Sequence, residues 1–123
     1  MPVDTPVLRV ARVRSIDNEP ISYLVSYVPV DLSGAMDRTA LNATPMLSLL
    51  EQAGVQIGAA TQTISASLAD GTLASLLEVD IGSPILRVSR TVFDAAHCPV
   101  QHVLAQFRPD RYQIKLDLHS ARA

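Results

Sequence analysis

A seven-residue segment occurs twice in this chain of 123 residues. Residues 6–12 read PVLRVAR, and residues 84–90, seventy-eight positions later, read PILRVSR. When one residue is inserted in the turn after the second copy, the match continues at an offset of seventy-nine, where Pro20 meets Pro99. Each copy therefore holds a strand-like run, a turn that ends in proline and a return run. We interpret the repeat as an internal duplication of a β-hairpin, so the fold must accommodate two such hairpins.

The remaining elements follow from polarity patterns and capping residues. Alternating, β-branched or aromatic runs predict strands over residues 7–15, 21–28, 56–68, 85–93, 100–107 and 111–119. Apolar spacing predicts helices over residues 44–54 and 70–77, with Thr44 and Asp70 as their N-caps. The order ββ-α-β-α-βββ predicts an α+β domain with a mainly antiparallel sheet and two short helices.

Composition narrows the class of protein. Hydrophobic residues make up 48% of the chain, which suffices for one core, and the net charge of −2 lacks the basic surplus of a domain that grips a phosphate backbone. Cys98 is the single cysteine, so no intrachain disulfide forms, which fits a reducing compartment. No run approaches the roughly 18 apolar residues that cross a bilayer, and the N-terminus lacks a secretory pattern. We expect a soluble, cytoplasmic domain with no membrane partner.

The duplication also suggests where the chain begins relative to its fold. A strand and a short helix, within residues 56–82, lead into the second hairpin, whereas only MPVDT precedes the first. If the two copies are equivalent, the first has lost its upstream strand and helix. We therefore expect residues 1–123 to form one domain of a longer parent protein.

No catalytic motif stands out. The chain contains no glycine-rich phosphate loop, HExxH, CxxC or GxSxG. The stretch DAAHCPVQH brings Asp94, His97, Cys98 and His102 close in sequence, but the spacing matches no standard zinc site and is typical of a turn. The three glutamates fall in predicted turns or helices. We expect no enzyme activity, no metal and no cofactor.

Four segments, taken in order, resemble a known family. RVRSIDNEPISYLVSYVP, LLEQAG, TQTISASLAD and LRVSRTVFDAAHCPVQHVLAQFRPDRY are similar to the UTRA domain, the effector-binding domain of the HutC-like branch of GntR-type bacterial repressors. The resemblance runs from about Pro6 to about Leu118. It implies a fold shared with chorismate lyase, a small-molecule effector and a homodimer. It also implies that DNA is bound only by an upstream winged helix-turn-helix domain, which we expect to lie outside residues 1–123.

The resemblance further implies an anion site. In members that bind phosphorylated sugars, two arginines of an RxR pattern hold the anionic group, and here these are Arg12 and Arg14. In a strand both side chains share a face with Leu8 and Val10, where guanidinium groups need an anion or a carboxylate partner. On the residues alone, a carboxylate of the same fold, or exposure at the strand end, would satisfy them equally well.

Further positions complete the predicted ligand site. The family uses hydroxyls at the start of the helix after the first hairpin, where Thr44 stands, either as a ligand contact or as an N-cap alone. Ser22 and Ser26 share a strand face with Leu24, and they either line the pocket or are ordinary strand residues.

Three positions depart from the sugar-binding members of the family. Those members carry glutamates where this chain has Leu24 and Gln101, and an aromatic hydroxyl where it has Phe107. The carboxylates that clasp sugar hydroxyls are therefore missing. A smaller or more apolar anion, such as a carboxylic or aromatic acid, fits this site better than an amino-sugar phosphate.

We accordingly expect a domain that senses a small anionic metabolite, dimerises, and allosterically controls DNA binding by an attached winged-helix domain of a GntR-type regulator. Two alternatives remain open. One is a chorismate lyase-like enzyme, and the other is a dimerisation module without a ligand, in which Leu24 and Phe107 fill the pocket. Arg90, the repeat equivalent of Arg12, is expected to support the sheet or to pair with Asp94, and Arg108 and Arg111 to form a charge cluster around Asp110.

Overall fold

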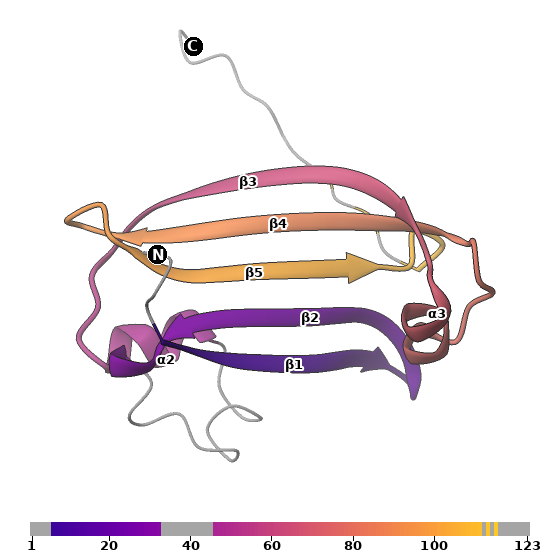
Figure 1. Ribbon diagram of the computed structural model, residues 1–123, viewed down its shortest axis with the longest axis horizontal. Coiled ribbons are helices and arrows are strands. Elements are labelled where there is room, and N and C mark those ends of the chain that lie inside the picture. Colours follow the sequence, from indigo (N-terminus) through magenta and orange to yellow (C-terminus); the bar gives the residue numbers. More distant parts are fainter. Residues whose placement is uncertain (1–5, 33–45, 112, 114, 116–123) are drawn as a thin grey trace, which may run out of the picture.

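The computed structural model describes residues 6–32, 46–111, 113 and 115, which form a five-stranded antiparallel sheet with two α-helices (Figure 1). The strands are β1 (Val7–Ile16), β2 (Glu19–Pro29), β3 (Ile57–Leu68), β4 (Pro84–Asp94) and β5 (Pro99–Phe107). The helices are α2 (Met46–Gln52) and α3 (Gly71–Leu77), and a single 3-10 turn, η1 (Val30–Leu32), follows β2. The predicted α+β class, with a mainly antiparallel sheet and two short helices, is confirmed.

The sheet joins the two duplicated hairpins through their return strands. Its order is β1-β2-β5-β4-β3, so that β2 pairs antiparallel with β5. Arg12 lies opposite Leu24 in the first hairpin, and Arg90 lies opposite Val103 in the second. These are the residues that the sequence repeat equates. The two copies therefore form hairpins with the same register, as the duplication predicts.

The pairing of β2 with β5 obeys the same symmetry. Tyr23 lies opposite Gln106, and Tyr27 lies opposite His102. The offset of seventy-nine carries Tyr23 onto His102 and Tyr27 onto Gln106, so it exchanges the two pairs. Two antiparallel strands related in this way share a local two-fold axis perpendicular to the sheet. Such an axis keeps each face on its own side, and equivalent residues of the two hairpins consequently share a face.

The two helices cover opposite faces of the sheet at opposite ends (Figure 1). Strand alternation defines face A by Arg12, Leu24 and Val28, and face B by Arg9, Tyr23 and Arg87. On face A, α2 buries Met46, Leu49 and Leu50 against Val28 and Val92. On face B, α3 buries Leu73, Ala74 and Leu77 against Ile85, with Tyr23 packed beside them. Among the helices of the described ranges, none has the length and apolarity needed to cross a membrane.

Local signals explain how the elements begin and end. The carboxylate of Asp70 accepts a hydrogen bond from the Leu73 amide at 2.8 Å, which confirms the predicted N-cap of α3. Asp17 and Asn18 both have positive φ, as a two-residue hairpin turn between β1 and β2 requires. In the second hairpin, the Asp94 carboxylate accepts the amides of Ala96 and Cys98, each at 2.9 Å, and so closes the predicted turn.

The predicted sixth strand, residues 111–119, is not found where the structure describes it. Arg111 lies in a turn, and Gln113 and Lys115 are not in a strand. The alternation of apolar and polar residues there thus does not produce sheet pairing at these three positions. The rest of this segment lies outside the described residues, as does Thr44, the predicted cap of the first helix.

Gly58 provides a test of how closely β3 approaches the second hairpin. A Cβ at Gly58 would lie 2.6 Å from the carbonyl oxygen of Asp94, whereas a Cβ at Gly71 would meet nothing closer than 4.0 Å. We expect Gly58→Ala to lower the free energy of unfolding by about 1–3 kcal/mol, because backbone must move to relieve the overlap. Gly71→Ala is the matched control, with a change between none and a gain of about 1 kcal/mol. Urea denaturation measures both, and equal stability of the two variants would contradict the close contact.

Candidate functional site

The predicted site residues of β1, β2 and β5 come together on face A. β1 supplies Arg12 and Arg14, β2 supplies Ser22, Leu24 and Ser26, and β5 supplies Gln101 and Phe107. The register places Arg14 opposite Ser22, and Ser22 opposite Phe107. Residues that are distant in sequence are therefore neighbours on one surface. Thr44, the remaining predicted site residue, lies outside the described ranges.

Each arginine stands at the end of a row of residues that crosses the sheet. One row consists of Arg12, Leu24, Ala105 and Val88, and the next consists of Arg14, Ser22, Phe107 and Leu86. Val88, Ala105 and Phe107 are buried together, with Leu24 and Leu86 packed against them. Arg12, which is half-buried, is thus the cross-strand neighbour of Leu24 at the edge of this apolar cluster, while Arg14 is exposed beside the buried Ser22.

Buried polar groups complete face A. Ser22, Ser26 and Gln101 are 2%, 4% and 5% exposed, and they are the buried polar residues of the described part of the chain. All three lie on face A. Burying a hydroxyl or an amide is unfavourable unless it forms hydrogen bonds. Face A therefore combines two cations, three buried hydrogen-bonding groups and an apolar cluster. These groups are chemically suited to binding a small anion with an apolar body.

The repeat equivalent of Arg12 has a different role. The Nε and Nη2 atoms of Arg90 donate hydrogen bonds to Oε1 of Gln62 on β3, at 2.9 and 2.7 Å. Arg90 therefore ties the edge strand to the sheet, as expected of a supporting residue. It does not pair with Asp94, whose carboxylate is engaged by the amides of the β4–β5 turn.

The predicted charge cluster is confirmed, and it lies directly after the C-terminal end of β5. Arg108 pairs with Asp110 at 2.9 Å and with Glu19 at 3.2 Å, and Arg111 pairs with Glu19 at 2.9 Å. The hydrogen bond from Arg108 lowers the pKa of Asp110 and raises the pKa of the guanidinium. These charges satisfy one another, so the cluster joins the start of β2 to the end of β5.

The stretch DAAHCPVQH forms the β4–β5 turn and the start of β5. His97 has a positive φ in the turn, Cys98 is exposed, and His102 Nδ1 lies 3.0 Å from Thr91 Oγ1. Within residues 6–32 and 46–111, no group of three or more histidine, cysteine or acidic residues is placed to hold a metal ion.

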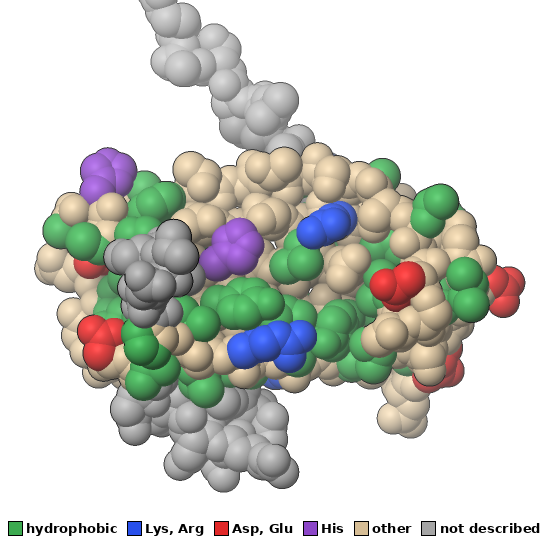
Figure 2. Space-filling model, viewed as in Figure 1, with side chains coloured by type: hydrophobic (Ala, Val, Ile, Leu, Met, Phe, Trp, Pro, Cys, Tyr) green, Lys and Arg blue, Asp and Glu red, His purple; other side chains and the backbone are tan. Residues whose placement is uncertain are grey.

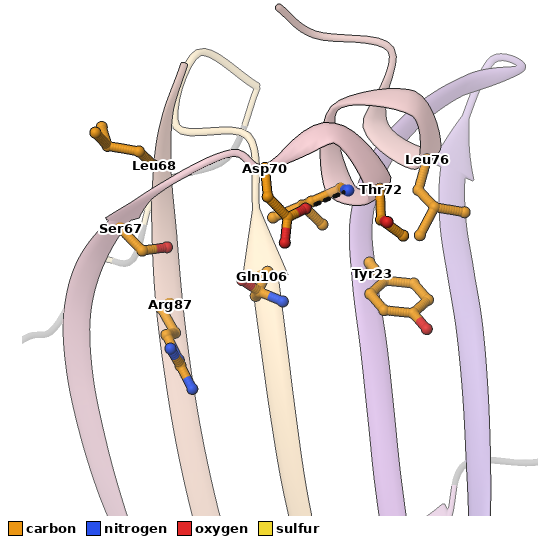
Figure 3. Close-up of a pocket in the computed structure, with 9 residues that line it drawn as sticks. Tyr23, Ser67, Leu68, Asp70, Thr72, Leu76, Arg87 and Gln106 are labelled. Carbon is orange, nitrogen blue, oxygen red and sulfur yellow. Dashed lines mark hydrogen bonds between the residues drawn. The ribbon is translucent and has the colours of Figure 1, made fainter. Parts of the chain in front are cut away.

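A pocket on face B was missed by the sequence reasoning. It measures about 240 Å³ and lies between α3 and the strands, with Ser67, Arg87 and Gln106 in its lining (Figure 3). Strand alternation does place Arg87 on the face opposite Arg90, and this is the one sequence signal that could have indicated a polar group there. The pocket itself needs side chains from four strands and a helix, which no local pattern brings together.

Comparisons with known proteins agree on one family. Residues 1–113 match the model of the UTRA domain. The chain is 31% identical over 111 residues to the HTH-type transcriptional regulator Rv0792c of Mycobacterium tuberculosis, a match that covers 87% of this chain and 41% of the relative. It is 24% identical over 104 residues to the HTH-type transcriptional repressor NagR of Bacillus subtilis, a match that covers 85% of this chain and 43% of the relative. The chain thus spans less than half the length of these curated relatives.

Solved structures show the same fold. A GntR-family transcriptional regulator from Enterococcus faecalis superposes with a TM-score of 0.84 at 29% identity, over 94% of this chain and 83% of that one. The effector domain of PhnF from Mycobacterium smegmatis superposes with a TM-score of 0.81 at 21% identity, over 97% and 74%.

The Arg108 cluster predicts a pH dependence of stability. Because the pKa of Asp110 is lowered in the folded state, its contribution is present above the ordinary pKa of 3.8 and is lost as the pH falls through the lower folded value. We expect Asp110→Asn to be less stable than wild type near about pH 6, and the difference to vanish toward about pH 2. Asp80→Asn, at an exposed aspartate without an ion pair among the described residues, is the control. A pH-independent difference in urea midpoint between Asp110→Asn and wild type would contradict this assignment.

Proposed function

Because the chain belongs to the UTRA domain family, we propose that it is the effector-sensing domain of a GntR-type transcriptional regulator and that it binds a small anionic metabolite on face A. One observation carries the proposal. The two arginines of the RxR pattern share a face with Ser22, Ser26 and Gln101, the buried polar residues of the described chain. Such a concentration of hydrogen-bonding groups on one face favours a ligand site over a purely structural surface.

The residues of face A also favour a class of ligand. Arg12 and Arg14 offer planar, charged donors that match the geometry of a carboxylate or a phosphate. Leu24 and Phe107 belong to the adjoining apolar cluster, and neither can bond a sugar hydroxyl through its side chain. An acid with an apolar or aromatic body therefore fits face A better than a polyhydroxylated anion.

Sensing would act through the quaternary structure. We infer that the chain forms a homodimer, and that the anion has different affinities for two arrangements of that dimer. A ligand shifts such an equilibrium only by its differential affinity for the two states. The curated relatives are HTH-type regulators that extend well beyond the matched region, which supports DNA contact through an attached domain.

Face A favours a sensor over a chorismate lyase-like enzyme. An enzyme of that kind would need a catalytic carboxylate beside the arginines. Glu19 is engaged by Arg108 and Arg111, Glu78 ends α3 in the left-handed conformation, and Glu51 is exposed on α2. None of the chain's three glutamates therefore lies on the strand surface of face A, and Glu51 is on the exposed side of the helix that covers one end of it.

A dimerisation module without a ligand is the second candidate function. Leu24 and Phe107 pack in the same apolar cluster, and Phe107 is only 9% exposed. This is the arrangement expected if their side chains occupy the space of the ligand. The anion screen described next separates the two candidates, since a filled site binds none of the anions.

A thermal-shift screen tests the sensor. The panel contains sugar phosphates, dicarboxylates, aromatic acids, urocanate and chorismate. At about 100 times its dissociation constant, a specific ligand adds about 2.7 kcal/mol to the free energy of unfolding, which raises Tm by several degrees. We expect an aromatic or aliphatic acid to give the largest shift. Arg12→Gln and Arg14→Gln should each weaken its binding by about tenfold or more.

Arg90→Gln is the matched control, because it removes the repeat-equivalent arginine from the same face while leaving Arg12 and Arg14 intact. Its anion affinity should equal that of wild type. A cooperative melt that no anion shifts would favour the dimerisation module. A shift with chorismate alone, accompanied by release of product, would favour the enzyme.

A further inference from the structure

We propose that the pocket between α3 and face B is a second ligand site, which takes a small zwitterion that carries one carboxylate and one ammonium group, such as a free amino acid. The pocket has a volume of about 240 Å³ (Figure 3). It lies on the opposite face of the sheet from Arg12 and Arg14, and its lining contains none of the residues of the proposed effector site. The proposal therefore goes beyond the function assigned to face A.

Four neighbouring strands form the floor of this pocket, and α3 with its cap forms the wall above them. Tyr23, Gln106 and Arg87 lie in one row across β2, β5 and β4, and Ser67 stands near the end of β3. Asp70, Thr72, Leu73 and Leu76 line the pocket from the helix side, and Leu68 lines it at the end of β3. In Figure 3 these side chains surround a common space below the helix.

Several polar side chains around this space have no partner. The hydroxyl oxygen of Ser67 is buried and forms no hydrogen bond. Within the part of the chain that the structure describes, the exposed side chains of Thr72 and Arg87 and the half-buried side chain of Gln106 form no hydrogen bond or ion pair with the protein. A buried donor without a partner costs about 1–3 kcal/mol. A polar ligand in the pocket would remove this cost for Ser67 and engage the other three groups.

The internal repeat shows that Arg87 differs from its counterpart. Its equivalent is Arg9, which lies opposite Tyr27 on the same face. Hydrogen bonding to Tyr27 and then to Tyr23 raises the pKa of the Arg9 guanidinium. Arg87 lies opposite Gln106 instead of a tyrosine. Face B is turned toward the viewer in Figure 2, where basic side chains lie on either side of a hydrophobic group.

The charges of the pocket select the class of ligand. Arg87 is positive, and Asp70 is negative. One carboxylate oxygen of Asp70 caps α3 through the Leu73 amide, while the other points from the helix toward the strands (Figure 3). A simple anion would meet the carboxylate of Asp70, and a simple cation would meet Arg87. A zwitterion places a carboxylate on Arg87 and an ammonium group on Asp70, while Leu73 and Leu76 accommodate an apolar side chain.

Three probes of similar shape test this assignment. L-leucine carries both charges, 4-methylpentanoate lacks the ammonium group, and 3-methylbutylamine lacks the carboxylate. Each is titrated into the isotope-labelled chain, and backbone amide shifts report both affinity and location. We expect leucine to shift the amides of Ser67, Arg87 and Gln106 in a saturable way, with an affinity at least about tenfold above either single-charge probe.

Variants separate the two charges. Arg87→Gln should weaken leucine binding at least about tenfold, to the affinity that the wild-type chain has for 3-methylbutylamine. Asp70→Asn should reduce it to the level of 4-methylpentanoate without unfolding α3, because asparagine is an equally good N-cap. Arg90→Gln, on the same strand but on the opposite face, is the control and should bind leucine as wild type does.

Two results would overturn the second site. One is leucine that binds no better than its single-charge analogues, and the other is leucine binding that survives Arg87→Gln. Neither result bears on face A, because the anion screen depends on Arg12 and Arg14. Failure of the effector proposal and failure of the second site are therefore distinguishable.

Discussion

The antiparallel pairing of β2 with β5 is the interaction on which the rest of the structure depends. An isolated two-stranded hairpin is marginally stable, whereas two hairpins joined along their return strands make a sheet that helices can cover on both faces. The register of this pairing puts Ser22 opposite Phe107 and Leu24 opposite Ala105. The arginines of β1 and the apolar cluster of the second hairpin thereby share face A. A slip of one residue would move the face A side chains of the second hairpin to face B. The candidate site therefore exists only in this register.

The duplicated hairpins have kept their geometry and changed the roles of their arginines. On face A, Arg90 is tied to Gln62, while its equivalent Arg12 adjoins the apolar cluster. On face B, Arg9 lies opposite Tyr27, and Tyr27 and Tyr23 raise the pKa of its guanidinium, whereas its equivalent Arg87 lines a pocket. The equivalent arginines of the two hairpins therefore have different surroundings on each face. A single repeat thus supplies two faces with different chemistry, which is how a small sheet accommodates two proposed sites.

Local patterns predicted much of this fold, because strand alternation and helix caps depend on neighbours in sequence. The hairpins, β3, both helices and the cap at Asp70 followed from such patterns, and alternation placed Arg12 and Arg14 on one face. Long-range features did not follow. No local signal shows that β2 pairs with β5, or that α2 and α3 cover opposite faces. The pocket beside Arg87 was missed for the same reason. The alternation over residues 111–119 also predicted a strand that Arg111 does not join, since a period of two indicates capacity for pairing and provides no partner.

The most direct test of the effector site follows the side-chain Nε–Hε signals of the arginines while the labelled chain is titrated with the best acid of the anion panel. We predict saturable shifts of the Arg12 and Arg14 signals at the same ligand concentration, with the Arg90 signal unchanged because its guanidinium is held by Gln62. Shifts that grow linearly without saturation, or that appear equally on Arg90 and Arg108, would show general charge screening and would contradict a specific anion site on face A.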